Sequence, residues 1–316
     1  MSLCRAARSF PISRHTNRAG YSVVPKAKRI LMRMTPMPRS MPRRGTCTVA
    51  LQPVPTRIAM TIPVTTCISM NRRRVLQMTI QSDRGGGPRT AALLARMLQF
   101  GDSMFPIGGF SFSCGLESAI QKGIVVDTKT LAAYARTAVE QAARGDGIAL
   151  IAAHNAASAA DFDALVQIDS VVFARKLSEE TRTMTVRMGK KFTEIGLQVI
   201  DLPFLRRWCE CIEAGTTPGC YPISLAVNFA VQNLSAREAF VVHQYGVAAM
   251  ILGASLRLMR ISHMDTQRIL YDLNARVDAD YQIAAKTRLS DMAGYAPLTE
   301  ILAAVHTKAH VRLFMS

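Results

Sequence analysis

The sequence predicts an all-α protein, built as a single helical bundle of about ten helices. From residue 91 onward, apolar residues recur at spacings of three and four, which is the period of one helix face. Runs of β-branched residues with period two are absent there, so no sheet is expected. The same part is rich in Ala, Leu, Ile, Val and Met and is long enough to bury one core. We therefore expect one helical domain over residues 89–316.

Hydrophobic periodicity defines the individual helices. In chain order they are expected over residues 91–101, 113–122, 128–143, 146–158, 161–175, 178–199, 202–214, 222–232, 235–259, 263–285 and 296–305. Side chains that accept hydrogen bonds from the free N–H groups of a first turn support three of the starts, at Asp127, Ser178 and Ser235.

The helix over 178–199 has a distinct apolar stripe. One of its faces carries Met184, Met188, Phe192, Ile195 and Val199. Acidic residues at its start complement the helix dipole. Arg182 lies off the stripe, where a surface ion pair with a neighbouring acid would be ordinary and would contribute little to stability.

Nearly all of the net charge of +17 lies in the first 90 residues, which hold 17 basic residues and one acidic residue. Prolines are too dense there for a helix, so residues 1–88 are expected to form a disordered Arg/Pro/Met-rich extension. It could bind nucleic acid or anionic lipid, act as a transit peptide, or serve as a solvated linker. We favour a fourth interpretation, in which residues upstream of a true start at Met60, Met70 or Met78 are included, because aromatic interleaving, an amphipathic helix and a cleavage pattern are all absent.

Motifs for catalysis and metal binding are absent or weak. The sequence contains no P-loop, Gly-x-Ser-x-Gly or His-Glu-x-x-His motif. Its seven cysteines include no Cys-x-x-Cys pair and fit a reducing cytoplasm. The longest apolar stretch, 247–256, is shorter than the roughly 18 residues of a membrane span. His306 and His310 could share a helical face as imidazole ligands, but without a nearby carboxylate or thiolate they make a poor metal site.

The segment from Phe105 to Glu117, Phe-Pro-Ile-Gly-Gly-Phe-Ser-Phe-Ser-Cys-Gly-Leu-Glu, is the most informative part of the sequence. Pro106 should end the preceding helix, and Gly108 and Gly109 permit positive φ or a close approach by another backbone. Ser113 can cap the next helix, with Glu117 in its first turn. The phenylalanines either fold back into the core or are presented to a partner.

Two further segments bear on that choice: 178–182, Ser-Glu-Glu-Thr-Arg, which leads to Arg187-Met188-Gly189, and the chain end from His306 to Ser316. In this order and at these separations, the three segments resemble the UreF family of urease accessory proteins. The family's loop reads F-P-I/V-G-G/S-F/Y-S/T-x-S-x-G-L-E. The similarity runs from about Leu93 to Ser316.

The resemblance implies a non-enzymatic scaffold that bridges UreD (UreH) and the GTPase UreG, so that nickel reaches apo-urease. It also implies a homodimer within a larger complex, with no intrinsic cofactor and with nickel handled by the assembled complex. Arg182 would order a helix junction near an interface. The tail would bind UreD, with Arg312 pairing a carboxylate and Phe314 filling a pocket of the partner.

A fourth region resembles the family only in part. Asp265 and Gln267 match its P-L-G/S-Q-x-D-G-Q segment, whereas Arg260, His263 and Thr266 replace the Pro, the first Gln and the Gly. His263 is kept as a weak interface candidate, because it can still donate hydrogen bonds. The expected partner-binding residues are Phe105, Pro106, Gly108, Gly109, Phe110, Ser111, Glu117, Arg182, His263, Asp265, Gln267, Arg312, Leu313 and Phe314.

Two other classes of function remain at this point. A helical nucleic-acid-binding protein could use the basic N-terminal arm, although the arm lacks interleaved aromatic residues. An enzyme is the third possibility, but no general base, nucleophile or cofactor cradle can be recognised.

Overall fold

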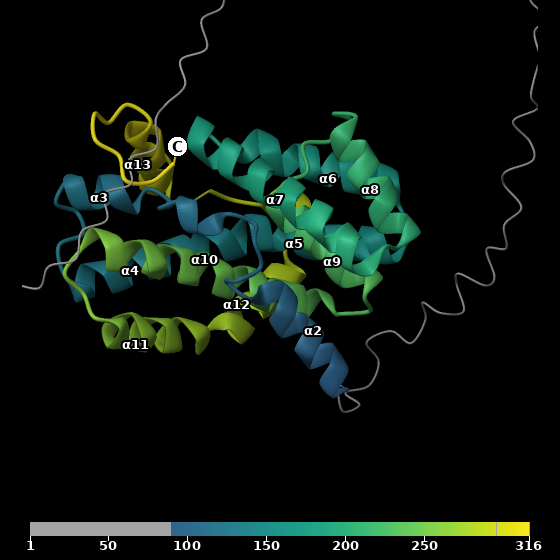
Figure 1. Ribbon diagram of the computed structural model, residues 1–316, viewed down its shortest axis with the longest axis horizontal. Helices are drawn as coiled ribbons and strands as arrows, with labels where there is room; N and C mark the ends of the chain where they lie inside the picture. The colour runs from purple at the N-terminus through teal and green to yellow at the C-terminus, as the bar shows by residue number, and fades with distance from the viewer. Residues whose placement is uncertain (1–89, 295, 316) are drawn as a thin grey trace, which may run out of the picture. The chain divides into compact units, whose positions relative to one another are not determined.

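The computed structural model describes residues 90–294 and 296–315, all of which belong to one compact unit. These residues form helices and no strand, which confirms the all-α class (Figure 1). The extension over 1–88, with its possible start sites, lies outside the described residues.

The observed helices follow the predicted ones closely. They are α2 (Ala91–Gly101), α3 (Leu116–Gln121), α4 (Thr128–Arg144), α5 (Asp146–Ser158), α6 (Phe162–Arg175), α7 (Glu179–Ile200), α8 (Pro203–Glu213), α9 (Tyr221–Val231), α10 (Ala236–Leu258), α11 (His263–Asn274), α12 (Val277–Lys286) and α13 (Pro297–His306). Short 3-10 turns are η2 (Gly109–Ser111) and η3 (Leu289–Asp291).

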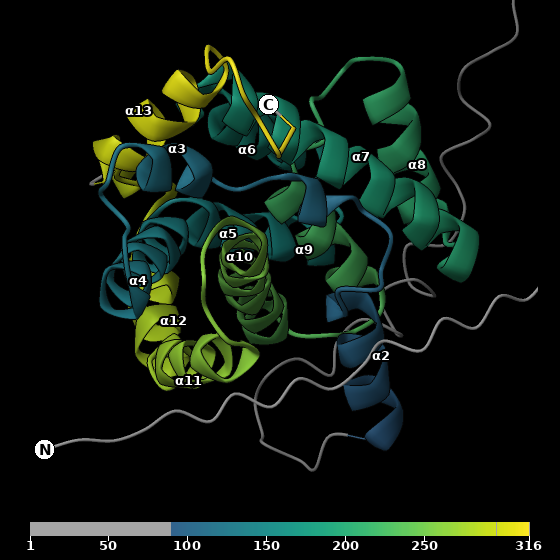
Figure 2. The ribbon, with the colours of Figure 1, turned by 60° about the vertical axis from the view of Figure 1, so that its left-hand side comes forward.

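Helix α10 is the centre of the bundle. It contacts α2, α3, α4, α5, α9, α11 and α12, and Figure 2 views it nearly end-on with α4, α11 and α12 around one side. By length and composition this helix could cross a membrane, which the sequence did not lead us to expect. However, 56% of the 18-residue apolar segment of this helix is buried inside the protein, as in the core helix of a bundle.

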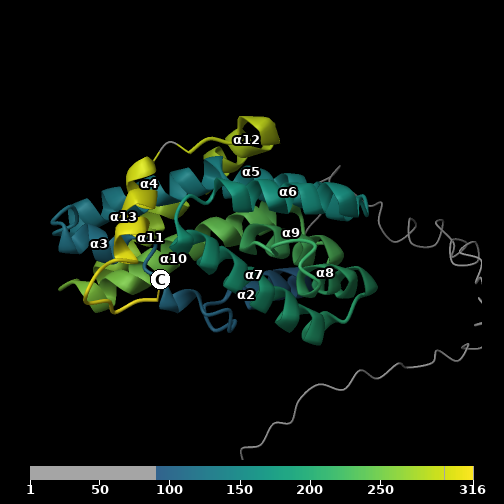
Figure 3. The same ribbon diagram turned by 90° about the horizontal axis from the view of Figure 1, so that it is seen from above.

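The core consists of two hydrophobic clusters, and α10 contributes to both. The first includes Phe192, Trp208, Phe229 and Phe240, and the second includes Leu116, Leu131, Ile251, Leu302 and Phe314. Helix α13 packs on α3 and on the start of α7, which brings the end of the chain over the second cluster (Figure 3).

The three expected N-caps are confirmed. Asp127, Ser178 and Ser235 each accept a hydrogen bond from the backbone N–H three residues later. Ser113 was expected to cap α3, but Gly115 occupies the cap position, because Cys114 and Gly115 have φ of 52° and 79° and the chain turns before the helix. The Ser113 hydroxyl still accepts a hydrogen bond from the N–H of Glu117 in the first turn, at 3.5 Å.

Two details of the helices differ from the prediction. The helix expected over 263–285 is interrupted at Ala275 and Arg276, because α11 packs its apolar residues into the second cluster while Ala284 of α12 packs into the first. At the break, Arg276 forms an ion pair with Glu140 of α4 at 3.0 Å. On α7 the stripe ends early, because Val199 is 53% exposed.

Candidate functional site

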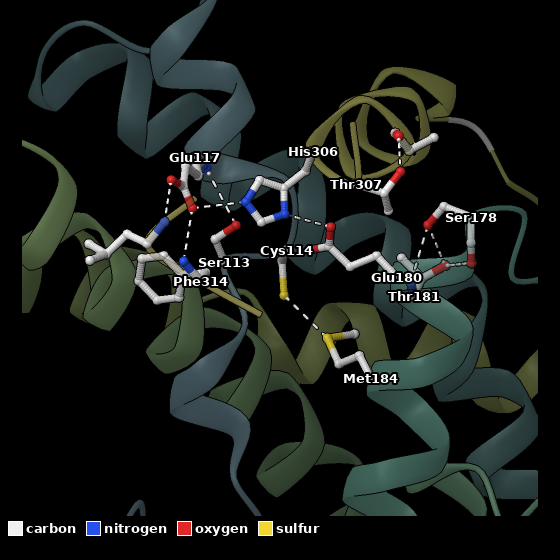
Figure 4. A network of polar contacts seen from close by, with 12 residues as sticks. Ser113, Cys114, Glu117, Ser178, Glu180, Thr181, Met184, His306, Thr307 and Phe314 are labelled. Atoms are coloured by element: carbon white, nitrogen blue, oxygen red, sulfur yellow. Dashed lines mark hydrogen bonds and ion pairs between the residues drawn. The ribbon is translucent and has the colours of Figure 1, made fainter. Parts of the chain in front are cut away.

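The three segments that resemble the UreF family meet around one side chain, His306, at the end of α13. Figure 4 shows the loop before α3, the start of α7 and the end of the chain converging on its imidazole ring. The segments are far apart in the sequence, so only the fold brings them together.

His306 lies between two buried carboxylates. Its Nδ1 is 2.7 Å from Oε2 of Glu180, and its Nε2 is 2.9 Å from Oε2 of Glu117 (Figure 4). The ring is fully buried, and both glutamates are nearly so. A neutral imidazole donates from one nitrogen only, so this geometry suits an imidazolium. The hydrogen bond to Glu180 is the main reason that the pKa of His306 is raised, and the Glu117 carboxylate adds to it.

The positions of these groups on their helices favour the same charges. Glu180 lies in the first turn of α7, near the positive end of the helix dipole. His306 lies in the last turn of α13, near the negative end. The dipoles therefore stabilise the carboxylate and the imidazolium, respectively.

Glu117 also holds the tail of the chain. Its Oε1 accepts a hydrogen bond from the backbone N–H of Leu313 at 2.8 Å, and its Oε2 accepts one from the N–H of Phe314 at 3.1 Å. Bonds of this kind, to an ionised acceptor, are stronger than those between neutral groups. One buried carboxylate thus joins α3, α13 and the tail.

The tail also binds the loop that precedes α3. The N–H of Met315 donates to the carbonyl of Ser111 at 2.8 Å. From α10, the Arg257 guanidinium donates to the carbonyl of Phe110 at 2.8 Å and lies 4.2 Å from the centroid of the Phe314 ring. The loop and the tail therefore form one structure, which Arg257 fastens to α10.

This arrangement corrects the interpretation of Phe314. The sequence suggested that its ring fills a pocket of a partner, but only 5% of the residue is exposed and its ring packs in the second cluster of its own chain. The neighbouring Arg312 and Leu313 are exposed. The tail offers these two side chains to solvent and uses Phe314 as an internal anchor.

The aromatic loop divides its phenylalanines between core and surface. Phe105 is buried against Phe100 and Phe192, with ring centroids 5.0 and 5.1 Å away, so its assignment as a partner contact is wrong. Phe112 is buried as well, whereas Phe110 is 73% exposed. The sequence had left both outcomes open, and each holds for part of the loop.

Gly108 has the positive φ that the sequence predicts, 78°. Gly109 does not need its lack of a side chain, since the atom nearest to an added Cβ would be Cε of the Met188 side chain, at an ordinary contact distance of 3.4 Å. Pro106 follows α2 and is exposed. These residues shape the loop and place Phe110 at its tip.

A cavity of about 510 Å³ lies beneath the loop. Methionines 184, 188 and 250 line it together with Tyr221 and His243. Burial lowers the pKa of His243 to about 4, so the ring is neutral at physiological pH. Nearby, burial raises the pKa of the Cys114 thiol to about 12, which argues against a reactive nucleophile at this position.

Arg182 joins two helices rather than pairing with an acid. Its Nε donates to the carbonyl of Lys176, the C-cap residue of α6, at 2.7 Å. Its guanidinium also lies 5.5 Å from the centroid of the Phe173 ring. The helix junction that the resemblance implied at this position is therefore present, and its contact with a partner stays a prediction.

The region around His263 is separate from the His306 network. Helix α11 lies on the opposite side of α4 and α10 from α13 (Figures 1 and 2). Asp265 forms a capping box with Ser262, whose hydroxyl donates to it and lowers the pKa of the carboxyl. His263 and Gln267 are exposed on α11. Asp265 has a structural role that requires no partner.

The two candidate metal ligands do not come together on one helix face. Helix α13 ends at His306, and His310 lies beyond it on the surface. Both ring nitrogens of His306 already contact carboxylates. Among the described residues, no group of three His, Cys, Asp or Glu side chains is arranged to hold a metal ion.

Two residues of the network were not identified as site residues from the sequence. Glu180 was assigned only a role in complementing the dipole of α7. Arg257 gives no signal in the sequence, because an exposed basic residue in the last turn of a helix is ordinary. Its contacts with the loop and the tail depend on the fold.

Comparison with known proteins identifies the family of the chain. Residues 125–274 match the protein family UreF. The urease accessory protein UreF 2 of Brucella canis is 55% identical over 223 residues, which cover 71% of this chain and 92% of that protein. UreF of Yersinia pseudotuberculosis is 49% identical over 224 residues, covering 71% and 98%. At this identity and coverage, the chain belongs to the UreF family of urease accessory proteins.

Proposed function

We propose that this protein is a non-enzymatic scaffold of urease maturation that binds UreD (UreH) and the GTPase UreG while nickel is delivered to apo-urease. One observation carries the proposal: the loop and the tail together present exposed apolar side chains on a fixed backbone. We call Phe110, Leu313 and Met315 the loop–tail surface; they are 73%, 63% and 48% exposed. Nickel is the cargo of the complex here and not a resident cofactor of this chain.

The loop–tail surface has the physical character of a recognition site. Its backbone is held by the hydrogen bonds to Glu117, Ser111 and Arg257, so little conformational entropy remains to be lost on binding. Aromatic side chains such as Phe110 are enriched at the cores of protein interfaces relative to the rest of the surface. Arg312, exposed beside these apolar groups, suits bidentate pairing with a carboxylate of the partner.

The other parts of the proposal rest on membership of the family. The relatives are named urease accessory proteins, and we infer a cytoplasmic protein that acts as a homodimer within the maturation complex. The nucleic-acid alternative depends on the basic arm over residues 1–88, which lies outside the described residues. Within the described part of the chain, no observation favours it.

Co-purification with UreD tests the proposal directly. Phe110→Ala and Leu313→Ala each remove an exposed side chain, so the fold should persist while UreD binding weakens about 30-fold, as for an interface hot spot. Val199→Ala is the matched control, because Val199 is also exposed and apolar but lies in the last turn of α7, whereas the tail lies near the first turn.

Urease activity in a strain that lacks its own UreF gives the second measurement. Both surface variants should restore less activity than the wild type, and the control should restore it fully. Wild-type UreD binding and activity for both variants would refute the assignment of the loop–tail surface. Loss of helical circular dichroism for Phe110→Ala would show instead that this residue supports the fold.

A further inference from the structure

We propose that His306 and Glu180 are positioning residues for the tail. They act through Glu117 and couple the position of the tail to the first turn of α7. The proposal rests on the function proposed above, because it concerns how the loop–tail surface is held. It assigns a purpose to a buried cluster of charges that reaches that surface only through hydrogen bonds from Glu117 to backbone N–H groups of the tail.

The coupling follows a continuous series of contacts. Glu180 touches His306 Nδ1 at 2.7 Å, and no hydrogen bond joins its side chain to the tail in the described structure. His306 Nε2 contacts Oε2 of Glu117 at 2.9 Å. The same oxygen accepts the N–H of Phe314 at 3.1 Å. A change at Glu180 therefore reaches the tail in three steps.

The groups are buried enough for each step to matter. Glu117, Glu180 and His306 are at most 3% exposed, so water screens their interactions weakly. Glu117 must place its two oxygens so that they meet two backbone N–H groups and one ring N–H at once. A carboxylate beside each ring nitrogen raises the pKa of His306 and favours a ring that donates to both, with Glu180 making the larger contribution. Loss of the Glu180 charge would thus weaken the contact that orients Glu117.

The same series joins the two candidate contact regions of the protein. Thr181 and Arg182 follow Glu180 in the first turn of α7, and Arg182 ties that turn to α6. The tail leaves α13 directly after His306. A partner whose binding moved Glu180 would alter the tail, and one that moved the tail would alter Glu180, since coupling between two sites is reciprocal.

Hydrogen exchange at the backbone N–H groups of Leu313 and Phe314 tests the coupling in the full chain, with no partner present. Glu180→Gln should accelerate exchange at both groups about tenfold, as expected when a hydrogen bond between charged groups is lost. Glu117→Gln changes the side chain that accepts these two N–H groups directly, so it should accelerate their exchange at least as much. Because no partner is used, a negative result would leave the proposed UreD-binding role untouched.

Glu300→Gln is the matched control. Glu300 of α13 also joins α13 to the start of α7, where its Oε2 accepts hydrogen bonds from Ser178 N and Thr181 Oγ1, both at 3.1 Å, but it does not contact His306. This variant should change exchange at Leu313 and Phe314 less than about twofold. Equal acceleration by Glu180→Gln and Glu300→Gln, or none by Glu180→Gln, would overturn the proposal.

Removal of residues 312–316 supplies a second measurement if Glu180→Gln proves to be unfolded by circular dichroism. Without the tail, Glu117 loses two donors, and its hold on His306 changes. Exchange at the N–H groups of Thr181 and Arg182 should then accelerate severalfold, whereas exchange at the start of α4 should not. Unchanged exchange at α7 in the truncated chain would refute the coupling.

Discussion

Replacement of Phe314 by alanine tests whether the tail is packed on its own chain or is free until a partner binds it. The ring is 5% exposed, packs in the second cluster and lies beneath the Arg257 guanidinium. Truncation of a buried phenylalanine to alanine costs roughly 3–5 kcal/mol in a protein core. Because Phe314 is close to the chain end, the loss of stability cannot exceed the free energy with which the tail docks.

We therefore expect the free energy of unfolding to fall by about 3 kcal/mol in Phe314→Ala, the lower end of that range. For a domain of this size, such a loss lowers the melting temperature by roughly 6–12 °C. Thermal unfolding followed by circular dichroism measures it. Leu313→Ala is the matched control, since its side chain is 63% exposed and its replacement should change stability by no more than about 0.5 kcal/mol.

A melting temperature of Phe314→Ala within 2 °C or so of the wild type would refute the reasoning, given the expected shift. So would equal losses in the two variants. The first result would mean that the ring adds nothing to the fold and that the tail is free to dock in a partner, as the sequence alone suggested. The second would mean that the burial of the Phe314 ring does not distinguish it from the exposed Leu313 side chain.

Three further changes probe the packing and the buried charges. Gly189→Ala should lower the free energy of unfolding, measured in urea, by at least about 2 kcal/mol, because the added Cβ would lie 2.0 Å from the carbonyl oxygen of Gly219 in the chain before α9. Gly253→Ala is the control and should not destabilise the protein, because its added Cβ meets no atom within 4 Å. His306 has a raised pKa, so its contribution is present below pH 6.5 and is lost as pH rises through the folded-state pKa; His306→Gln should remove that decline from urea unfolding measured against pH. His243 resists protonation until about pH 4, so stability should fall by roughly 3 kcal/mol between pH 6.5 and pH 4, and His243→Gln should flatten this acid limb.

The helices could be predicted because their signals are local. Periodicity placed α4 and α7 within one residue at each end, and the hydroxyl of Ser178 marked where α7 begins. The interruption between α11 and α12 had no such signal. It depends on two apolar faces packing into different clusters, and the sequence of either helix alone does not contain that information.

Whether each aromatic side chain is buried or exposed could not be predicted for the same reason. Phe105 and Phe110 belong to the same short loop, on either side of a glycine pair, yet one packs against Phe192 of α7 and the other is exposed. Phe314 looks like a free end in the sequence. Its burial depends on Glu117 and Arg257, which are distant in the chain and become neighbours only through α3 and α10.

The buried charges explain how three distant segments form one defined surface. Apolar contacts alone would allow the tail to shift along α3, because such packing has little directional preference. The Glu117 carboxylate accepts hydrogen bonds from two successive backbone N–H groups, which fixes the register of the tail to a single residue. His306 and Glu180 in turn restrict the orientation of that carboxylate. A shift of one residue would expose Phe314 and bury Leu313, so the loop–tail surface that we propose as a recognition site exists only in the register that these charges select.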